Sequence, residues 1–322
     1  MSPQGRPDED TVAGFGEFGL IRAITENRKQ PRSTLLGPGD DAAVVAAPDG
    51  RVVATKDVLV QGVHFRLDWS TPEHVGRKAI AVNLADLAAM GAAPTSVLIG
   101  LACPADTKAS LITELVDGMW AEAGRVGVGV VGGDLVRADQ LVVSITALGD
   151  LRGLNPVTRS GARPGDIVAV CGKLGWAAAG LAVLGRGFRS PVSVVNAQRV
   201  PEPPYSAGPS AAAAGATSMI DVSDGLLADL GHIAAASEVG IDVHTDRIPV
   251  HQRLVEVGTA LGADPLKWVL TGGEDHALAA TFPPFADLPE GWARIGSVTM
   301  PESGVTVDGK PYAGESGWEH WR

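Results

Sequence analysis

Acidic residues recur beside glycines in this chain, and this pattern restricts the fold more than any other feature. Glycine has no side chain, so the backbone can turn sharply and approach a ligand closely there. Carboxylates that a fold brings together repel one another unless hard cations lie between them. The pattern therefore predicts a site for Mg²⁺ and, through Mg²⁺, for nucleotide phosphates. It occurs at Gly39-Asp40-Asp41, Gly132-Gly133-Asp134, Asp221-Val222-Ser223-Asp224-Gly225 and Gly272-Gly273-Glu274-Asp275.

The composition is that of a soluble chain with two domains of ordinary size. It has 322 residues, of which 45% are hydrophobic. The 26 Lys and Arg against 37 Asp and Glu give a net charge of −11 without a basic stripe, so we expect no nucleic-acid partner. Cys103 and Cys171 lie far apart and form neither a metal knuckle nor a disulfide framework. No apolar run is long enough to span a bilayer, so we expect a cytoplasmic protein without a membrane partner.

Alternating helix and strand patterns predict an α/β (α+β) fold with domains at 1–152 and 153–322, joined near the Asn155–Gly165 segment. A hairpin is expected between 42–46 and 52–60, across Pro48-Asp49-Gly50. The other expected strands are 95–101, 126–131, 141–148, 166–170, 218–220, 269–270 and 277–281. The expected helices are 18–24, 72–90, 108–123, 176–184 and 226–236.

Asp86 is the most informative single acid. A helical wheel places it on a stripe of small apolar residues that includes Ala79, Val82 and Ala89. A carboxylate there costs several kcal/mol unless a cation or hydrogen-bond donors compensate it. The stripe predicts a ligand-binding Asp. The alternative is a buried Asp bonded to an arginine or to backbone groups.

The other candidates each have a simpler alternative. Asp221, Ser223 and Asp224 precede a helix, where capping explains one side chain and magnesium-phosphate binding explains all three. Gly133 and Asp134 suit a phosphate-binding turn or a plain β-turn. Three more candidates also have a simpler interpretation. Glu274 is then a turn acid, and His64 is a packed or capping histidine. Arg159 is either a polyphosphate clamp or, in the simpler interpretation, a linker residue.

Several common sites are excluded. The chain has no GxxxxGK[ST] loop, no protein-kinase His-Arg-Asp loop, no zinc-like His/Cys spacing and no G-x-S-x-G elbow. The segment Gly127–Gly132 matches GxGxxG, but it lies within a predicted strand and opens no helix. A P-loop, zinc, serine-hydrolase or dinucleotide site is therefore not expected.

Taken together, the motifs resemble those of the thiamine-monophosphate kinase family, in the aminoimidazole-ribotide synthetase superfamily. The matching segments run in order from Gly16-Glu17-Phe18 to Trp318 and include Gly37–Ala42, Asp57–His64, Asn83–Gly91, Gly132–Asp134, Thr158–Gly161, Ile220–Leu226 and Gly272–Asp275. The resemblance implies ATP-dependent phosphorylation of thiamine monophosphate to thiamine diphosphate, with several Mg²⁺ ions. It also implies a homodimer whose N-terminal sheets join into a barrel. The N-terminal domain would bind ATP and Mg²⁺, and the C-terminal domain would complete the site.

The resemblance also assigns residues by motif. Metal binding would fall to Asp41, Thr55, Lys56, Asp57, Asp86, Asp134, Asp221 and Asp224; ATP binding to Gly133, Asp134, Arg159 and Ser223; and substrate binding to His64, Glu274 and Trp318. Two departures stand out. Lys56 replaces the family's usual Thr or Ser, which leaves its backbone carbonyl as the ligand atom. His276-Ala277 replaces the usual Tyr-Glu, a departure that bears on packing near Glu274.

A catalytic side chain is not expected, because the substrate phosphate is itself the nucleophile. A phosphate monoester has a second pKa near 6 and is ionised at neutral pH. Direct in-line transfer assisted by Mg²⁺ is thus the expected mechanism. The alternatives are another ATP-using synthetase of the superfamily and a non-catalytic nucleotide-binding scaffold.

Overall fold

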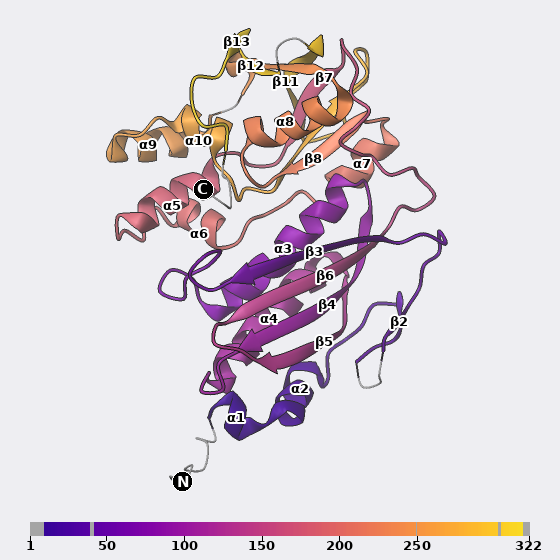
Figure 1. The fold of residues 1–322 in the computed structure, drawn as a ribbon, viewed down its shortest axis with the longest axis vertical. Helices are drawn as coiled ribbons and strands as arrows, with labels where there is room; N and C mark the ends of the chain where they lie inside the picture. Colours follow the sequence, from indigo (N-terminus) through magenta and orange to yellow (C-terminus); the bar gives the residue numbers. More distant parts are fainter. Residues whose placement is uncertain (1–9, 39–41, 249, 302–303, 318–322) are drawn as a thin grey trace. The chain divides into compact units, whose positions relative to one another are not determined.

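The computed structural model describes residues 10–38, 42–248, 250–301 and 304–317. The chain forms two compact units (Figure 1). The first unit comprises Met1–Asn83 and Pro94–Asp150, and the second comprises Leu84–Ala93 and Leu151–Arg322. Helix α3 (Pro72–Ala89) begins in the first unit and ends in the second. The proposed functional boundary at 152/153 stays a prediction.

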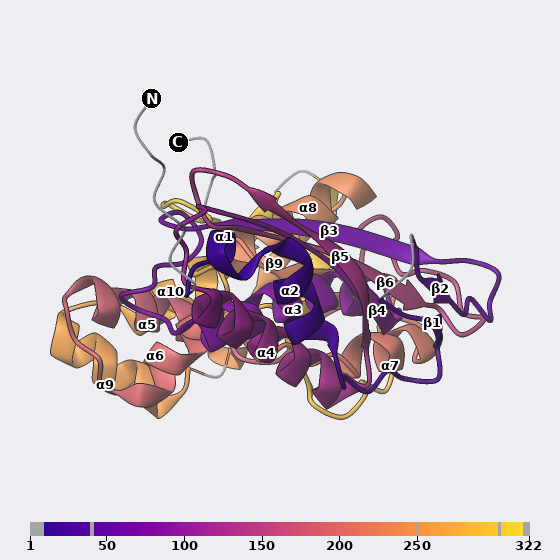
Figure 2. The ribbon, with the colours of Figure 1, turned by 90° about the horizontal axis from the view of Figure 1, so that it is seen from below.

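The first unit is built on a four-stranded sheet. Its order is β3 (Val53–Val60), β6 (Val142–Asp150), β4 (Ala93–Cys103) and β5 (Gly129–Arg137). Strands β3 and β6 are antiparallel, whereas β4 and β5 are parallel. Helices α3 and α4 (Ala109–Val126) lie along one face of this sheet in both views (Figures 1 and 2).

The two faces of this sheet differ in burial. Leu59, Ile145 and Leu101 are buried on the helix-covered face, whereas Lys56 and Val58 are exposed on the opposite face. This alternation is the period of two that a strand imposes on its side chains. It decides which of the predicted site residues share a face.

Helices α3 and α4 approach closely because glycines face each other's backbone. A Cβ on Gly76 would lie 1.8 Å from Leu115 O, and a Cβ on Gly118 would lie 2.1 Å from Glu73 O. Neither position tolerates a side chain without moving a helix. The two glycines therefore fix α3 against α4.

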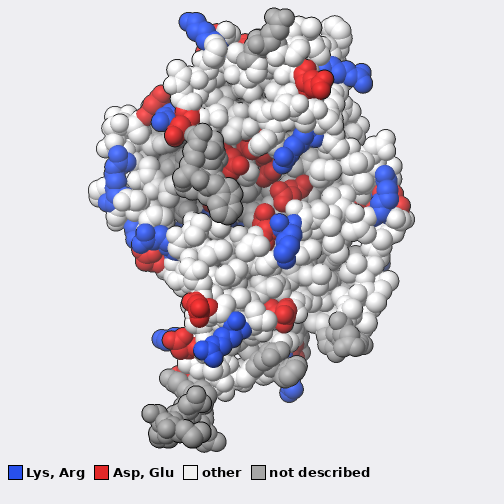
Figure 3. Space-filling view, in the orientation of Figure 1, with Lys and Arg blue, Asp and Glu red and all other residues white. Residues whose placement is uncertain are grey.

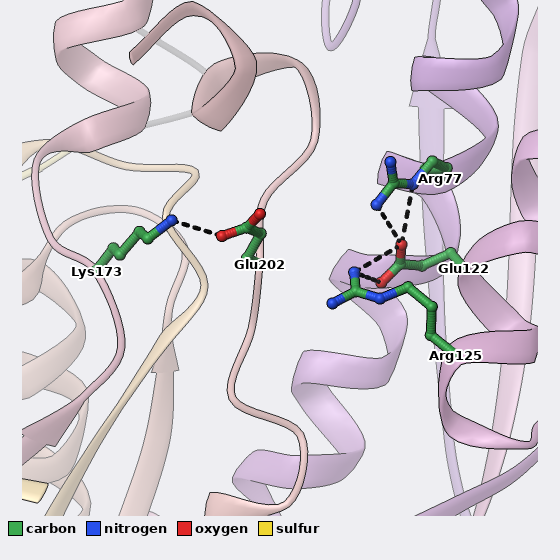
Figure 4. A network of polar contacts seen from close by, with 5 residues as sticks. All are labelled: Arg77, Glu122, Arg125, Lys173 and Glu202. Atoms are coloured by element: carbon green, nitrogen blue, oxygen red, sulfur yellow. Dashed lines mark hydrogen bonds and ion pairs between the residues drawn. The ribbon is translucent and has the colours of Figure 1, made fainter. Parts of the chain in front are cut away.

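A charged network also joins these helices. Glu122 of α4 is completely buried and accepts hydrogen bonds from Arg77 Nε and Nη2, both at 3.1 Å, and from Arg125 Nη1 at 2.9 Å (Figure 4). The arginine side chains are 28% and 50% exposed, so their charged ends reach water while the carboxylate does not. Two cations therefore compensate one buried anion.

The predicted hairpin is wrong. The turn forms, since Gly50 N donates to Ala47 O at 3.0 Å. However, β2 (Val44–Val45) pairs with β1 (Thr34–Leu36), and β3 pairs along its whole length with β6. The strand β3 pairs with the apolar strand β6, which is distant in sequence, although the local turn that would favour a hairpin forms. Helices α1 (Val12–Phe15) and α2 (Glu17–Thr25) precede these strands, and α2 confirms the helix expected at 18–24.

The second unit contains a seven-stranded sheet in the order β13-β12-β9-β11-β7-β10-β8. The strands are β7 (Ile167–Cys171), β8 (Ser218–Val222), β9 (Gly240–Val243), β10 (Ala277–Phe282), β11 (Trp292–Thr299), β12 (Val305–Val307) and β13 (Lys310–Pro311). The helices are α5 (Trp176–Gly185), α6 (Val192–Arg199), α7 (Ala207–Ala213), α8 (Leu226–Ser237), the 3₁₀ helix η1 (Thr245–Arg247), α9 (Gln252–Leu261) and α10 (Pro265–Thr271).

Small residues let α7 and the end of α3 pack onto this sheet. Ala88 and Ala211 join one core cluster with Met219, Leu278 and Phe282 of the strands. A Cβ on Gly208 of α7 would lie 1.9 Å from Ala88 O, so these two segments also touch through their backbones. The packing holds residues 84–93 in the second unit.

The strand expected at 269–270 is wrong, because these residues belong to α10. Asp264 is the N-cap of this helix and accepts a hydrogen bond from Leu266 N at 2.9 Å, with Pro265 in the first turn. This cap and proline are ordinary helix-start signals that outweigh a short apolar run.

Candidate functional site

Strand β3 places three predicted metal-binding residues on two different faces. Thr55 and Asp57 are half-buried on the face that α3 and α4 cover. Lys56 is exposed on the opposite face, where its Nζ donates to Thr146 Oγ1 of the paired strand at 3.4 Å. The structure thus brings Thr55 and Asp57 together and directs the Lys56 side chain away from them.

Asn83 of α3 holds β3 at Asp57. Its Oδ1 accepts a hydrogen bond from Asp57 N at 2.9 Å, and its Nδ2 donates to Ala79 O at 2.9 Å. Asn83 is completely buried, so both hydrogen bonds are shielded from water. Sequence reasoning missed this role, although a lone amide in an apolar helix was a visible signal.

Both turn interpretations of Gly133 and Asp134 are wrong, because these residues lie in the middle of β5, where they are exposed. A Cβ on Gly133 would lie 2.1 Å from Ile99 O, so the backbones require glycine here. Asp134 pairs with Gly100 and lies on the face opposite the buried Leu135. Its Oδ1 accepts a hydrogen bond from Leu135 N at 2.9 Å. Asp134 therefore does not share the face of Asp57.

His64 follows β3 and closes a tight turn. Its Nδ1 accepts a hydrogen bond from Val60 N at 3.0 Å, which matches the capping alternative. Lys78 of α3 is 3% exposed, and its Nζ donates to His64 O at 3.3 Å. A buried lysine beside a predicted substrate contact is a further feature that sequence reasoning missed.

Asp86 lies in the part of α3 that belongs to the second unit. It is half-buried, whereas every other residue from Lys78 to Ala89 is buried. Ala88 and Ala89, which follow it, pack against the sheet that carries Asp221. Asp86 thus lies on a segment of α3 that is otherwise buried, as the helical wheel indicated.

The segments Asp221–Gly225 and Gly272–Asp275 lie side by side in the second unit. Glu274 N donates to Ser223 O at 2.7 Å. A Cβ on Gly273 would lie 2.6 Å from Ser223 O, and a Cβ on Gly225 would lie 2.7 Å from Thr271 O. The glycines of both motifs thus let two backbone segments of the chain approach each other, whereas the sequence predicted approach to a ligand, which stays a prediction. Ser223, Asp224 and Glu274 are all partly exposed there.

The structure answers the capping question at α8. Its N-cap is Gly225, so none of Asp221, Ser223 and Asp224 occupies the N-cap position. Instead Asp229, in the first turn, accepts hydrogen bonds from Asp224 N and Gly225 N, both at 3.0 Å. Burial and then the charge of Asp221 raise the pKa of Asp229 to about 7.

Asp221 is buried on β8 and contacts His276, whose Nδ1 lies 3.0 Å from Asp221 Oδ2. The next acid in the glycine loop has another role. Asp275 accepts hydrogen bonds from Gly175 N and from Ala177 N, the latter at 2.8 Å, and so caps α5. Burial raises the pKa of Asp275 to about 7. Asp229, Asp275 and His276 are site-lining residues that the sequence interpretation did not single out for these contacts.

Arg159 lies on an exposed segment beside β8. Its carbonyl accepts a hydrogen bond from Ser237 Oγ at 2.9 Å, and the preceding Thr158 O accepts one from Met219 N at 3.1 Å. Asp41 and Trp318 lie outside the described residues. Gly317 is described, and a Cβ on it would lie 2.5 Å from Asp224 O.

The donor atoms are those that Mg²⁺ prefers, namely carboxylate, hydroxyl and carbonyl oxygens. Within the described ranges, no three His, Cys, Asp or Glu side chains form a ready-made metal site. The predicted acids are divided between the two units, with Asp57 and Asp134 in the first and Asp86, Asp221 and Asp224 in the second.

The surface carries both charges. On the face shown in Figure 3, Lys and Arg side chains stand singly among Asp and Glu. Across the described ranges, every helix is too short or too polar to cross a bilayer. Cys103 and Cys171 are both buried free thiols.

Comparison with known proteins defines the class of this chain. Residues 39–151 match the family model of the AIR synthase related protein, N-terminal domain, and residues 163–273 match that of the C-terminal domain. The chain therefore has the two-domain AIR-synthase-related architecture.

Similarity to individual proteins identifies the family within this class. The thiamine-monophosphate kinase of Mycobacterium tuberculosis is 52% identical over 313 residues, which cover 97% of this chain and 93% of that protein. The crystal structure of thiamine-monophosphate kinase from Stenotrophomonas maltophilia K279a is similar at a TM-score of 0.78, with 35% identity over 91% of this chain and 95% of that one. AaThiL complexed with AMPPCP and TMP also gives a TM-score of 0.78, with 33% identity and coverage of 95% and 97%. The chain belongs to the thiamine-monophosphate kinase family.

Proposed function

We propose that this protein is an ATP-dependent kinase that converts thiamine monophosphate to thiamine diphosphate. The observation that carries the proposal is the 52% identity to a thiamine-monophosphate kinase over 97% of this chain. The similarity to AaThiL complexed with AMPPCP and TMP supports the pairing of an ATP analogue with TMP as ligands. The glycine-flanked acids predicted the same chemistry from the sequence.

Mg²⁺ is the cofactor that this donor set suits. Asp221 and Asp229 are buried close enough for the charge of one to raise the pKa of the other, a crowding that a hard cation relieves. When bound, Mg²⁺ would neutralise the charge between ATP and the substrate phosphate and align the two. Several Mg²⁺ ions would be divided among Asp41, Thr55, Asp57, Asp86, Asp134, Asp221 and Asp224, with the Lys56 carbonyl, and Asp134 would not share an ion with Asp57 on the other face of the sheet.

The remaining residues would bind and orient the two reactants. Gly133 leaves the β5 backbone accessible to a phosphate, and Arg159 supplies a bidentate donor on an exposed segment. Ser223 lies beside Glu274, which places a proposed ATP contact next to a proposed substrate contact within one unit. His64 and Trp318 would complete the substrate contacts.

The substrate phosphate would attack ATP directly, without a phosphoenzyme. An ionised phosphate oxygen needs no general base, so the chain has to orient the two anions and exclude water. A phosphorylated side chain trapped during turnover would contradict this mechanism.

We also propose a cytoplasmic homodimer formed through the face of the first sheet that α3 and α4 leave uncovered. Val58, Leu98 and Val136 are 44%, 38% and 49% exposed on this face. A group of exposed apolar side chains on one sheet face is typical of an interaction surface. Sedimentation of the wild type and of Val58→Lys tests this, since the variant is expected to sediment as a monomer.

The activity is tested by incubating the protein with Mg²⁺ and ATP, with and without thiamine monophosphate, and separating the products. We expect thiamine diphosphate and ADP in equal amounts only when thiamine monophosphate is present. ADP formation that depends on a different acceptor would favour another ATP-using synthetase. Nucleotide binding without turnover of any acceptor would favour a non-catalytic scaffold.

A further inference from the structure

His276 contacts a proposed metal ligand. Its Nδ1 lies 3.0 Å from Asp221 Oδ2, and the two side chains are 8% and 7% exposed. Asp221 belongs to the proposed Mg²⁺ site, so the inference made here rests on the proposed function.

The backbone fixes this contact from both sides. Asp221 pairs with Leu278 across β8 and β10, two residues beyond His276. His276 N donates to Val222 O at 2.8 Å, next to Asp221. The backbones that carry the two side chains are therefore held next to each other.

The chemistry of His276 and Asp221 defines which atom donates the hydrogen bond and which accepts it. A carboxylate that binds a metal is ionised and only accepts hydrogen bonds, so Nδ1 carries the hydrogen and donates it to Oδ2. Oδ1 is then the oxygen that would bind a cation. Partners of this kind fix the orientation of metal ligands, and their loss commonly weakens metal binding by about 10–100-fold.

We propose that His276 is a positioning residue, which holds Asp221 Oδ2 through Nδ1–H so that Oδ1 is presented to Mg²⁺ at the nucleotide site.

Three substitutions separate this hydrogen bond from ring packing. Asn carries an N–H on the atom bonded to Cγ, as His does at Nδ1, so His276→Asn keeps the donor in place. His276→Gln moves the amide one bond further from the backbone, and His276→Phe removes the donor but keeps a ring. Residue 276 has a φ of +51, a left-handed conformation that Asn adopts more readily than Gln or Phe. The melting temperature of each variant without metal therefore measures the cost of this backbone conformation separately from metal binding.

The metal affinity is measured on the full chain with Mn²⁺ and AMPPCP, following free Mn²⁺ by electron paramagnetic resonance. We expect His276→Asn to bind Mn²⁺ within about threefold of the wild type and His276→Gln and His276→Phe to bind about tenfold more weakly. In turnover assays, the last two should need more Mg²⁺ for half-saturation while kcat at saturating Mg²⁺ changes less.

Equal weakening in the Asn and Gln variants, or unchanged Mn²⁺ binding in all three, would overturn the proposal. Asp221→Asn marks the site: if it binds Mn²⁺ as the wild type does, Asp221 is not a ligand and the proposal fails with it. A wild type that binds Mn²⁺ and AMPPCP but does not convert thiamine monophosphate contradicts the proposed activity alone. The comparison of the His276 variants still decides the positioning role in that case.

Discussion

The contact between α3 and α4 predicts that the same substitution in one helix has opposite effects at two positions. Gly118 and Gly124 both lie in α4. A Cβ at Gly118 would lie 2.1 Å from Glu73 O, whereas a Cβ at Gly124 would meet nothing within 4 Å. Gly118→Ala should therefore destabilise the first unit, and Gly124→Ala should stabilise it.

The magnitudes follow from two terms. Alanine is better than glycine in a helix interior by about 1 kcal/mol, and this gain applies at both positions. At Gly118 the facing atom is a backbone carbonyl, so no side-chain rotation relieves the overlap. The helices must separate by about 1.3 Å to reach ordinary contact, and overpacking of this kind costs roughly 3 kcal/mol. We expect Gly118→Ala to lose about 2 kcal/mol net and Gly124→Ala to gain about 1 kcal/mol.

Urea unfolding followed by far-ultraviolet circular dichroism measures both variants against the wild type. Gly118→Ala and Gly124→Ala make the same substitution in the same helix and are measured in the same solvent. The difference in helix propensity between glycine and alanine therefore cancels when the two variants are compared. Gly76→Ala, whose Cβ would lie 1.8 Å from Leu115 O, should behave like Gly118→Ala. The reasoning is refuted if Gly118→Ala is as stable as Gly124→Ala, because the close backbone approach would then not exist.

Three further predictions concern charged groups. Glu122→Gln should lower the free energy of unfolding by about 1–2 kcal/mol in urea titrations, since the two arginines left behind reach water; a larger loss than that of Gly118→Ala would contradict this. Asp86→Asn should lower kcat at least about 100-fold without changing the melting temperature, because it removes charge at constant shape; near-normal turnover would remove Asp86 from the site. Asp275 has a folded pKa of about 7 against 3.8 for the free group, so its contribution to stability is present below pH 4 and lost as pH rises to 7, by at most roughly 1.4 kcal/mol per unit. The stability advantage of the wild type over Asp275→Asn should therefore shrink between pH 4.5 and 7.5, and a constant difference would contradict the raised pKa.

Local signals predicted most of the elements because those signals are local in the structure too. The helix expected at 72–90 appears as α3, which begins at Pro72 and ends one residue before Met90. The strand expected at 277–281 appears as β10. The hairpin failed because pairing of β3 with β6 depends on residues about ninety positions away, which no local pattern specifies.

The candidate site residues were chosen by residue type, and their roles stay predictions. Glycine beside acid predicted close approach of the backbone to a ligand, whereas the approach that the structure shows is between the backbones of the Ser223 and Gly273 segments. The partners of the acids could not be foreseen, because Asn83 and His276 reach Asp57 and Asp221 from remote parts of the sequence. Asp134 and Asp57 also lie on opposite faces of the sheet. This separation depends on the register of the paired strands, which the sequence did not reveal.

The acids of the second unit divide by what their oxygens already bind. Asp275 and Asp229 accept backbone N–H groups at the starts of α5 and α8, so these two carboxylates fix loops. Asp224 donates its own backbone N–H to Asp229. Asp221 has one oxygen held by His276. Asp229 thus holds the backbone of the segment that carries the proposed ligands Asp221 and Asp224. Substitution of a capping acid should therefore affect stability first, and substitution of a ligand should affect metal binding first.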